Sequence, residues 1–214
     1  MKYAIIGAGG TGGSLGFFLT KAGKDVTLIA RGKHLEAIRK NGLGMERLWD
    51  HKREMIPVKA CTMEEYSDTP DVILVCVKGY SMTETIPVIR KLEGKDTVVL
   101  PILNIYGTGG KLQKEFPELT VPDGCIYVSA NILEPGVILR HGKILRVVFG
   151  ARKPEEETEK MREIAKDMAC ENIEVILSED IRRDAMVKFS YVSPIGVAGL
   201  YCNATAADFQ KDGE

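Results

Sequence analysis

The residues with the clearest chemistry stand near the start of the chain, where Gly7 to Gly12 have the spacing G-x-G-x-x-G. In a dinucleotide-binding turn, the first glycine permits a tight turn, the second admits a pyrophosphate and the third packs the helix on the sheet. Free N–H groups of the first helical turn and the helix dipole also favour an anion. We therefore predict a pyrophosphate site formed by Gly7, Gly9, Gly10, Thr11 and Gly12. A glycine-rich turn without a ligand, or a methyltransferase-like nucleotide site, remain alternatives.

The end of the second predicted strand indicates which dinucleotide is bound. An acidic side chain there would bind the ribose hydroxyls of NAD, but this chain has Arg31, followed by Lys33 and His34. A guanidinium matches the oxygens of a 2′-phosphate and stays charged. The sequence therefore predicts NADP(H) as cofactor. The alternative is that Arg31 caps a loop or pairs with Glu36.

Three further polar residues are candidates for chemistry. Lys78 and Asn104 each follow an apolar run that is typical of a buried strand, and ligands of α/β sheets bind beyond the carboxyl ends of strands. Lys188 is the only charged residue from 185 to 202. Burying an ammonium is costly unless it is paired, and a lysine with a shifted pKa can act as an acid. Snorkelling of Lys188 to the surface is the alternative.

The elements that would position these residues alternate along the chain. Strands are expected at 3–6, 26–29, 71–77 and 97–102, with helices at 12–21, 33–40 and 82–92 between them. This order predicts an α/β protein with a parallel sheet. Further on, we expect a hairpin that turns at His141-Gly142, a helix at 154–169 and a strand at 173–177. A helical stretch should open at 178–180, and Pro194 should bend or break it.

Composition excludes several classes of protein. The net charge of −1 over 214 residues gives no basis for a nucleic-acid or membrane-surface partner. Five scattered cysteines without a C-x-x-C spacing argue against a disulfide framework or a metal site, and favour a reducing compartment. No signal peptide or membrane span is predicted. We expect a cytoplasmic protein.

Several segments, taken together, carry a family resemblance. They are Gly7 to Gly12, Ala30-Arg31-Gly32, Asn41-Gly42-Leu43, Val77-Lys78-Gly79-Tyr80, Asn104, Pro135-Gly136-Val137, Glu179-Asp180-Ile181 and Lys188-Phe189. In this order and spacing the chain resembles the ketopantoate reductases (2-dehydropantoate 2-reductases) of pantothenate biosynthesis. The resemblance implies an NADP-binding Rossmann-type domain at 1–177, a doubly wound parallel sheet. The first part of an all-helical substrate and dimerisation domain, truncated, would follow at 178–214.

The resemblance also implies roles for the candidate residues. Gly7, Gly9 and Gly12 would hold the pyrophosphate and Arg31 the 2′-phosphate, with Lys78 and Asn104 at the nicotinamide and substrate. Lys188 would donate a proton to the carbonyl oxygen of a 2-oxo acid as hydride arrives from NADPH. A homodimer through the C-terminal helix is also implied.

The chain differs from the family at positions that are expected to contact the substrate. Leu103-Asn104-Ile105 stands where Gln-Asn-Gly is common, and Val192 and Gly196 stand where many members have asparagines. Ketopantoate or a close analogue is the expected substrate. A non-catalytic NADP(H)-binding module or fragment, and a different Rossmann hydroxy-acid dehydrogenase, are the alternatives.

Overall fold

The computed structural model describes residues 1–205 and 208–209. Its first sheet has five parallel strands in the order β5-β2-β1-β6-β7. These strands are β1 (Lys2–Ile6), β2 (Asp25–Ile29), β5 (Lys59–Cys61), β6 (Val72–Val75) and β7 (Val98–Pro101). The chain runs outward from β1 through β2 to β5, and then in the other direction from β6 to β7. The order therefore reverses between β1 and β6, which confirms the predicted Rossmann-type, doubly wound sheet.

The strands of this sheet are apolar throughout because both of their faces are buried. In β1, Tyr3 and Ile5 point into one hydrophobic core, while Ala4 and Ile6 point into a second core on the other face. A continuous apolar run is typical of a parallel sheet covered on both faces. The same pattern made the strands near 71–77 and 97–102 predictable.

The chain also forms a second sheet of five strands, two of which lie between β2 and β5 in the sequence. Its strands are β3 (Leu43–Arg47), β4 (Arg53–Ile56), β8 (Asp123–Glu134), β9 (Val137–Gly150) and β10 (Glu174–Leu177), in the order β10-β9-β3-β4 with β8 paired to β9. The predicted hairpin turn at His141-Gly142 is wrong, because β9 runs unbroken through both residues. The β8–β9 hairpin turns instead at Pro135-Gly136, where Gly136 has a φ of +84° that favours glycine.

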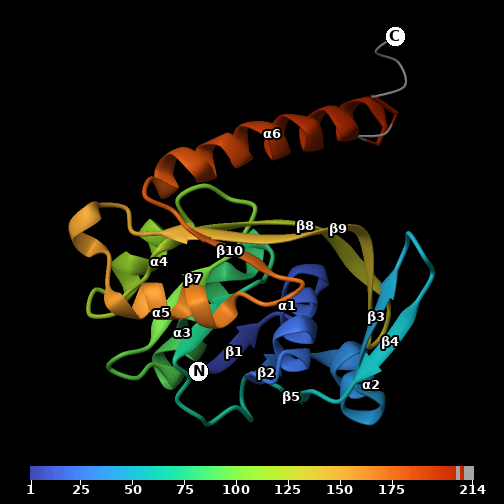
Figure 1. Ribbon diagram of the computed structural model, residues 1–214, viewed down its shortest axis with the longest axis horizontal. Helices are drawn as coiled ribbons and strands as arrows, with labels where there is room; N and C mark the ends of the chain where they lie inside the picture. Colours follow the sequence, from blue (N-terminus) through green and yellow to red (C-terminus); the bar gives the residue numbers. More distant parts are fainter. Residues whose placement is uncertain (206–207, 210–214) are drawn as a thin grey trace.

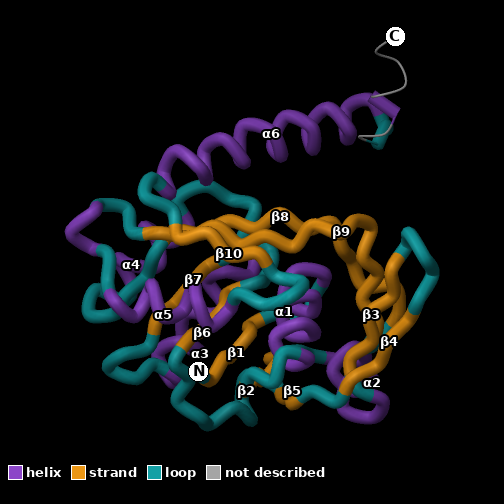
Figure 2. Tube along the Cα trace, in the orientation of Figure 1, coloured by secondary structure: helices purple, strands orange, loops and turns teal. Residues whose placement is uncertain are grey.

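The helices complete a layered arrangement (Figures 1 and 2). They are α1 (Gly10–Lys21), α2 (Gly32–Asn41), α3 (Met82–Leu92), α4 (Thr108–Glu115), α5 (Glu159–Met168) and α6 (Ile181–Cys202), with 3-10 turns η1 (Gly79–Ser81) and η2 (Pro154–Glu156). Residues of α1 and α5 share one core with both sheets, whereas α3 and α4 cover the far face of the first sheet. Helix α1 is therefore internal, and every residue from Gly12 to Leu19 is buried. The helix expected at 154–169 is η2 followed by α5.

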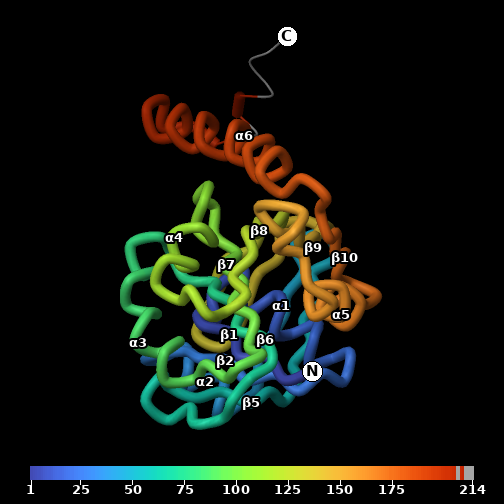
Figure 3. Tube along the Cα trace, turned by 90° about the vertical axis from the view of Figure 1, so that its left-hand side faces the viewer, coloured from blue at the N-terminus to red at the C-terminus, as the bar shows by residue number. Residues whose placement is uncertain are grey.

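Helix α6 lies across the outer face of the second sheet in both views (Figures 1 and 3). Asp180 caps it by accepting a hydrogen bond from the Arg183 N–H, and Pro194 does not break it. Its first turns pack on the sheet through Ile181 and Ala185, but Tyr201 near its end is 91% exposed. This helix begins the predicted segment 178–214, of which 206–207 and 210–214 lie outside the described residues. Within the described part of the chain, no helix has the length and apolarity needed to cross a membrane.

Candidate active site

The topology brings the candidate residues to one edge of the first sheet. The glycine loop follows β1, Arg31 follows β2, and Lys78 comes after β6. Asn104 comes after β7. Because all of these strands are parallel, their carboxyl ends share an edge, and this is where doubly wound folds bind ligands.

The glycine loop has space for a pyrophosphate at one position and tight packing at the others. A Cβ added to Gly9 would meet nothing within 4 Å, whereas one at Gly12 would lie 1.9 Å from the Gly7 carbonyl oxygen. Gly7 itself has a φ of +99°. Gly9 therefore leaves an open approach to the N-terminus of α1, and these residues fit a dinucleotide phosphate.

Gly10 has a role that the sequence did not reveal. Its Cβ would lie 2.1 Å from the Ala130 carbonyl oxygen, so Gly10 lets strand β8 pack against the start of α1. Packing alone accounts for glycine at this position. Whether Gly10 and Thr11 also contact a cofactor stays a prediction.

His34 forms hydrogen bonds that connect the glycine loop to the β8–β9 turn. In the sequence analysis it stood only as a basic residue near Arg31. Its Nδ1 accepts a hydrogen bond from the Gly136 N–H at 2.9 Å, so Nε2 carries the proton and donates to the Ala8 carbonyl at 2.8 Å. Burial lowers the pKa of His34, and the Ala8 carbonyl offsets part of this effect. The neutral imidazole therefore joins the loop to the β8–β9 turn. No sequence signal indicates this contact, because His34 and Gly136 are far apart in the chain.

Arg31 and Lys78 are both exposed at the sheet edge. Arg31 lies 3.6 Å from a carboxylate oxygen of Glu84 in α3, and not beside Glu36 as the alternative expected. An exposed ion pair of this kind is worth little, so the guanidinium can exchange it for a phosphate. Lys78 precedes η1 and extends from the same edge.

Lys188 and Asn104, which are distant in sequence, meet in the structure. The Lys188 Nζ donates a hydrogen bond to Asn104 Oδ1 at 2.5 Å, and it lies 5.5 Å from the centre of the Tyr127 ring. Lys188 is only 7% exposed. Burial lowers its pKa, and the nearby Cys125 thiol offsets part of that effect. A neutral amide and an aromatic ring thus hold the ammonium in place, while burial makes proton release easier than in water.

A small cavity lies beside this pair. Its volume is about 20 Å³, and residues of the loop after β7, the start of β8 and helix α6 line it. A cavity of this size has room for about one water molecule. As enclosed by the described residues, this cavity is too small for an organic acid.

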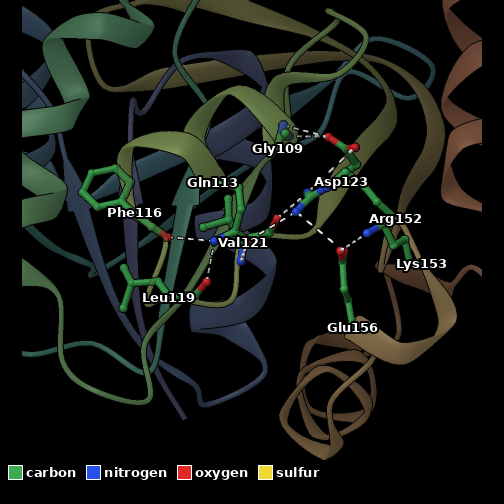
Figure 4. A network of polar contacts seen from close by, with 10 residues as sticks. Gly109, Gln113, Phe116, Leu119, Val121, Asp123, Arg152, Lys153 and Glu156 are labelled. Atoms are coloured by element: carbon green, nitrogen blue, oxygen red, sulfur yellow. Dashed lines mark hydrogen bonds and ion pairs between the residues drawn. The ribbon is translucent and has the colours of Figure 1, made fainter.

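A network of polar contacts holds the beginning of strand β8 in place (Figure 4). Asp123 opens β8 and accepts a hydrogen bond from the Gly109 N–H at 2.7 Å, which ties it to the first turn of α4. Arg152 donates to the Val121 carbonyl at 2.6 Å. These contacts hold the beginning of β8, which lines the cavity beside Lys188, against α4.

Comparison with known proteins agrees with this geometry. The family model described as ketopantoate reductase PanE/ApbA matches residues 3–154. A 2-dehydropantoate 2-reductase from Mesorhizobium japonicum is 31% identical over 88% of this chain and 63% of its own length. One from Pyrococcus horikoshii is 32% identical over 92% of this chain and 63% of its own length. The chain thus spans less than two thirds of these curated relatives.

Solved structures lead to the same family. The crystal structure of 2-dehydropantoate 2-reductase from Porphyromonas gingivalis superposes with a TM-score of 0.86 at 30% identity, covering 100% of this chain and 76% of the other. A 2-dehydropantoate 2-reductase from Geobacter metallireducens gives a TM-score of 0.81 at 26% identity, covering 91% and 64%. Because the family model matches most of its length and its doubly wound sheet superposes on these structures, the chain belongs to the ketopantoate reductase PanE/ApbA family.

Proposed function

We propose that this chain takes part in the NADPH-dependent reduction of a 2-oxo acid, ketopantoate or a close analogue. The observation that carries the proposal is the contact between Lys188 Nζ and Asn104 Oδ1 at the carboxyl edge of a Rossmann sheet. The names of the relatives support the reaction class, and the open approach at Gly9 supports the cofactor.

The proposed roles are those that the family resemblance implies, and the place of these residues at the carboxyl edge of the sheet supports them. Gly7, Gly9 and Gly12, with Gly10 and Thr11, would hold the pyrophosphate at the N-terminus of α1, and Arg31 would bind the 2′-phosphate. Lys78 and Asn104 would lie at the nicotinamide and the substrate. When bound, the cofactor supplies a hydride from its nicotinamide ring.

Lys188 would act as the general acid. Negative charge develops on the carbonyl oxygen of a 2-oxo acid during reduction, and the Lys188 Nζ would donate a proton to that oxygen. Asn104 Oδ1 would keep the ammonium oriented. Burial lowers the pKa of Lys188, which brings its acidity closer to that required near neutral pH.

The test is NADPH consumption with a panel of 2-oxo acids that includes ketopantoate. We expect Lys188→Ala to lower the turnover rate by about 10²- to 10⁴-fold, the usual contribution of a general acid. Arg182→Ala is the matched control, because Arg182 is an exposed basic residue on the same helix. Unchanged turnover in Lys188→Ala would remove the proposed mechanism.

A second candidate function is a non-catalytic NADP(H)-binding module. It is favoured by the cavity of about 20 Å³ beside Lys188, which is too small for a 2-oxo acid when only the described residues enclose it. NADPH binding without turnover on any oxo acid would favour this function. Turnover on hydroxy acids or sugar phosphates alone would instead indicate a different Rossmann dehydrogenase.

The remaining expectations also stand as proposals. They are a domain boundary between 177 and 178, a cytoplasmic location and a homodimer through α6. The exposed apolar side chains near the end of α6, Leu200 and Tyr201, support the third. Sedimentation of the wild type and of Leu200→Ser tests it, because a dimer through this face should dissociate more readily in the variant.

A further inference from the structure

A second and larger cavity lies at the other end of helix α1 from the glycine loop. Its volume is about 410 Å³. We call it the Arg140 cavity. Its walls include Phe18, Arg47, Trp49, Lys52, Arg140 and Lys143. In all, five basic and two acidic side chains line it, so positive charge predominates.

Arg140 is the unusual residue of this cavity. It is only 2% exposed, and it stands among the largest fully buried side chains of the chain. Its Nη2 donates to the Lys143 carbonyl at 2.8 Å, but its Nε finds no hydrogen-bond partner in the part of the chain that the structure describes. The guanidinium lies 5.1 Å from the centre of the Phe18 ring and 5.7 Å from that of Trp49. A buried guanidinium normally has a carboxylate partner, because losing its hydration is costly.

No carboxylate within the described residues forms an ion pair with Arg140 at 4.0 Å or less. Its neighbour in the parallel register of β3 and β9 is another cation, Arg47, and like charges placed opposite each other repel. Two nearby carboxylates pair with other cations of the cavity wall: Asp50 with Arg47 at 3.0 Å, and Glu54 with Lys21 at 2.7 Å. Glu171 also lines the cavity and forms no ion pair within the described residues, so three carboxylates stand against five cations. Burial, and then the charge of Arg47, lower the pKa of Arg140. The cavity therefore contains positive charge that the neighbouring acidic side chains leave uncompensated.

We propose that the Arg140 cavity binds a small organic oxyanion. The phosphate or carboxylate group of this ligand would accept hydrogen bonds from the Arg140 guanidinium, whose planar fork of donors matches both groups. The apolar part of the ligand would pack against Trp49, which is 36% exposed. The glycine loop is at the opposite end of α1, so this site is separate from the proposed dinucleotide site and does not depend on it.

The chain carries its own reporter for this site, because Trp49 is its only tryptophan. The experiment is a titration of the full chain with sodium phosphate, and separately with sodium benzoate, at constant ionic strength maintained with sodium chloride. We expect Trp49 emission to change and saturate with at least one of the two anions and to stay constant with chloride alone. The phosphate and benzoate arms then distinguish a phosphate ligand from an aromatic carboxylate.

Three variants locate the binding. Arg140→Met removes the charge while keeping a long side chain, and it should weaken the apparent affinity by about tenfold or more, as expected for the loss of charge-assisted hydrogen bonds. Arg31→Gln is the matched control, because it removes one positive charge at the proposed dinucleotide site and should leave the Trp49 response unchanged. If Arg140→Met does not fold, Lys143→Gln provides the test at the wall of the same cavity, with an expected weakening of about threefold or more.

Several results would overturn the proposal. One is a response of Trp49 that rises linearly or is the same with chloride. Another is an undiminished affinity in folded Arg140→Met, or in Lys143→Gln where the first variant fails. A loss of response in Arg31→Gln equal to that in Arg140→Met would also overturn it, since it would attribute the effect to net charge. None of these outcomes depends on whether the chain reduces a 2-oxo acid.

Discussion

Two alanine substitutions in the glycine motif should have opposite consequences. At Gly9, φ is −72° and an added Cβ meets no atom within 4 Å. At Gly12, the Cβ would lie 1.9 Å from the Gly7 carbonyl oxygen, and 3.0 Å from Cys76 Cβ and from Ile5 Cγ2. We therefore expect Gly9→Ala to leave the fold intact while it fills the approach to the pyrophosphate, and Gly12→Ala to damage the fold.

The magnitudes follow from these contacts. In Gly9→Ala, the reduced entropy of the unfolded chain stabilises by about 0.4–1 kcal/mol. Alanine is a poorer N-cap residue than glycine by a similar amount, so the free energy of unfolding should change by less than about 0.5 kcal/mol. Gly12→Ala should cost about 1–3 kcal/mol or more, the usual range for overpacking, because the backbone oxygen that it meets cannot rotate away.

The assay is thermal unfolding with and without NADP⁺. At a concentration of about 100 Kd, a ligand stabilises the native state by about 2.7 kcal/mol. For a chain of this length, that corresponds to a rise in Tm of about 5–11 °C. If Gly9→Ala weakens binding about a hundredfold, the same NADP⁺ concentration contributes only about 0.4 kcal/mol, or roughly 1 °C.

Either of two results would refute this reasoning. A full NADP⁺-dependent rise in Tm for Gly9→Ala would show that the pyrophosphate does not approach this position. A wild-type Tm for Gly12→Ala in the absence of NADP⁺ would show that α1 does not pack on the sheet as described.

Three further predictions concern basic side chains around the candidate site. Lys188→Met should raise the free energy of unfolding by about 0.5–2 kcal/mol in denaturant titrations, since it removes a buried ammonium whose pKa burial lowers; a clear loss of stability would contradict this. Arg31→Gln should lower the preference for NADPH over NADH by about tenfold in direct binding measurements, and an unchanged preference would argue against the 2′-phosphate contact. The His34 pKa is lowered in the folded state, so the unfolded chain binds more protons and stability should be lost as pH falls below about 6.5, by at most about 1.4 kcal/mol per pH unit. His34→Gln should lack that part of the pH dependence of unfolding, and identical pH profiles for the two proteins would exclude it.

Much of the fold was predictable because the parallel sheet leaves a local signature. Buried strands at 72–75 and 98–101 appear as continuous apolar runs, and the helices between them have an apolar stripe. Once the strands are parallel, geometry places Arg31, Lys78 and Asn104 at one edge without further information. The cost of leaving a buried ammonium unpaired indicated that Lys188 needs a partner, but nothing in the sequence identified that partner as Asn104.

The second sheet was harder to predict because long-range pairing decides its turns. His141-Gly142 is typical of a hairpin turn, yet β9 continues past it, because β9 is paired on both sides of this point: with β8 and β3 up to Arg140, and with β8 and β10 from Leu145 onward. The two residues lie instead at a shift in the β8–β9 register. The role of His34 and the packing of Gly10 on Ala130 depend on the same sheet. Pro194 was expected to bend or break its helix, and α6 nevertheless continues past it to Cys202.

The burial of α1 between two sheets has a consequence for the conformational change that accompanies nucleotide binding. A helix that packs against a sheet on each side has little freedom to tilt. Its first turn and the preceding loop should therefore adopt one backbone conformation whether or not a phosphate is present. Rigid receptors avoid the entropic penalty of ordering flexible segments on association. We therefore expect lock-and-key behaviour at the pyrophosphate, with any conformational adjustment confined to the exposed Arg31 and Lys78 side chains.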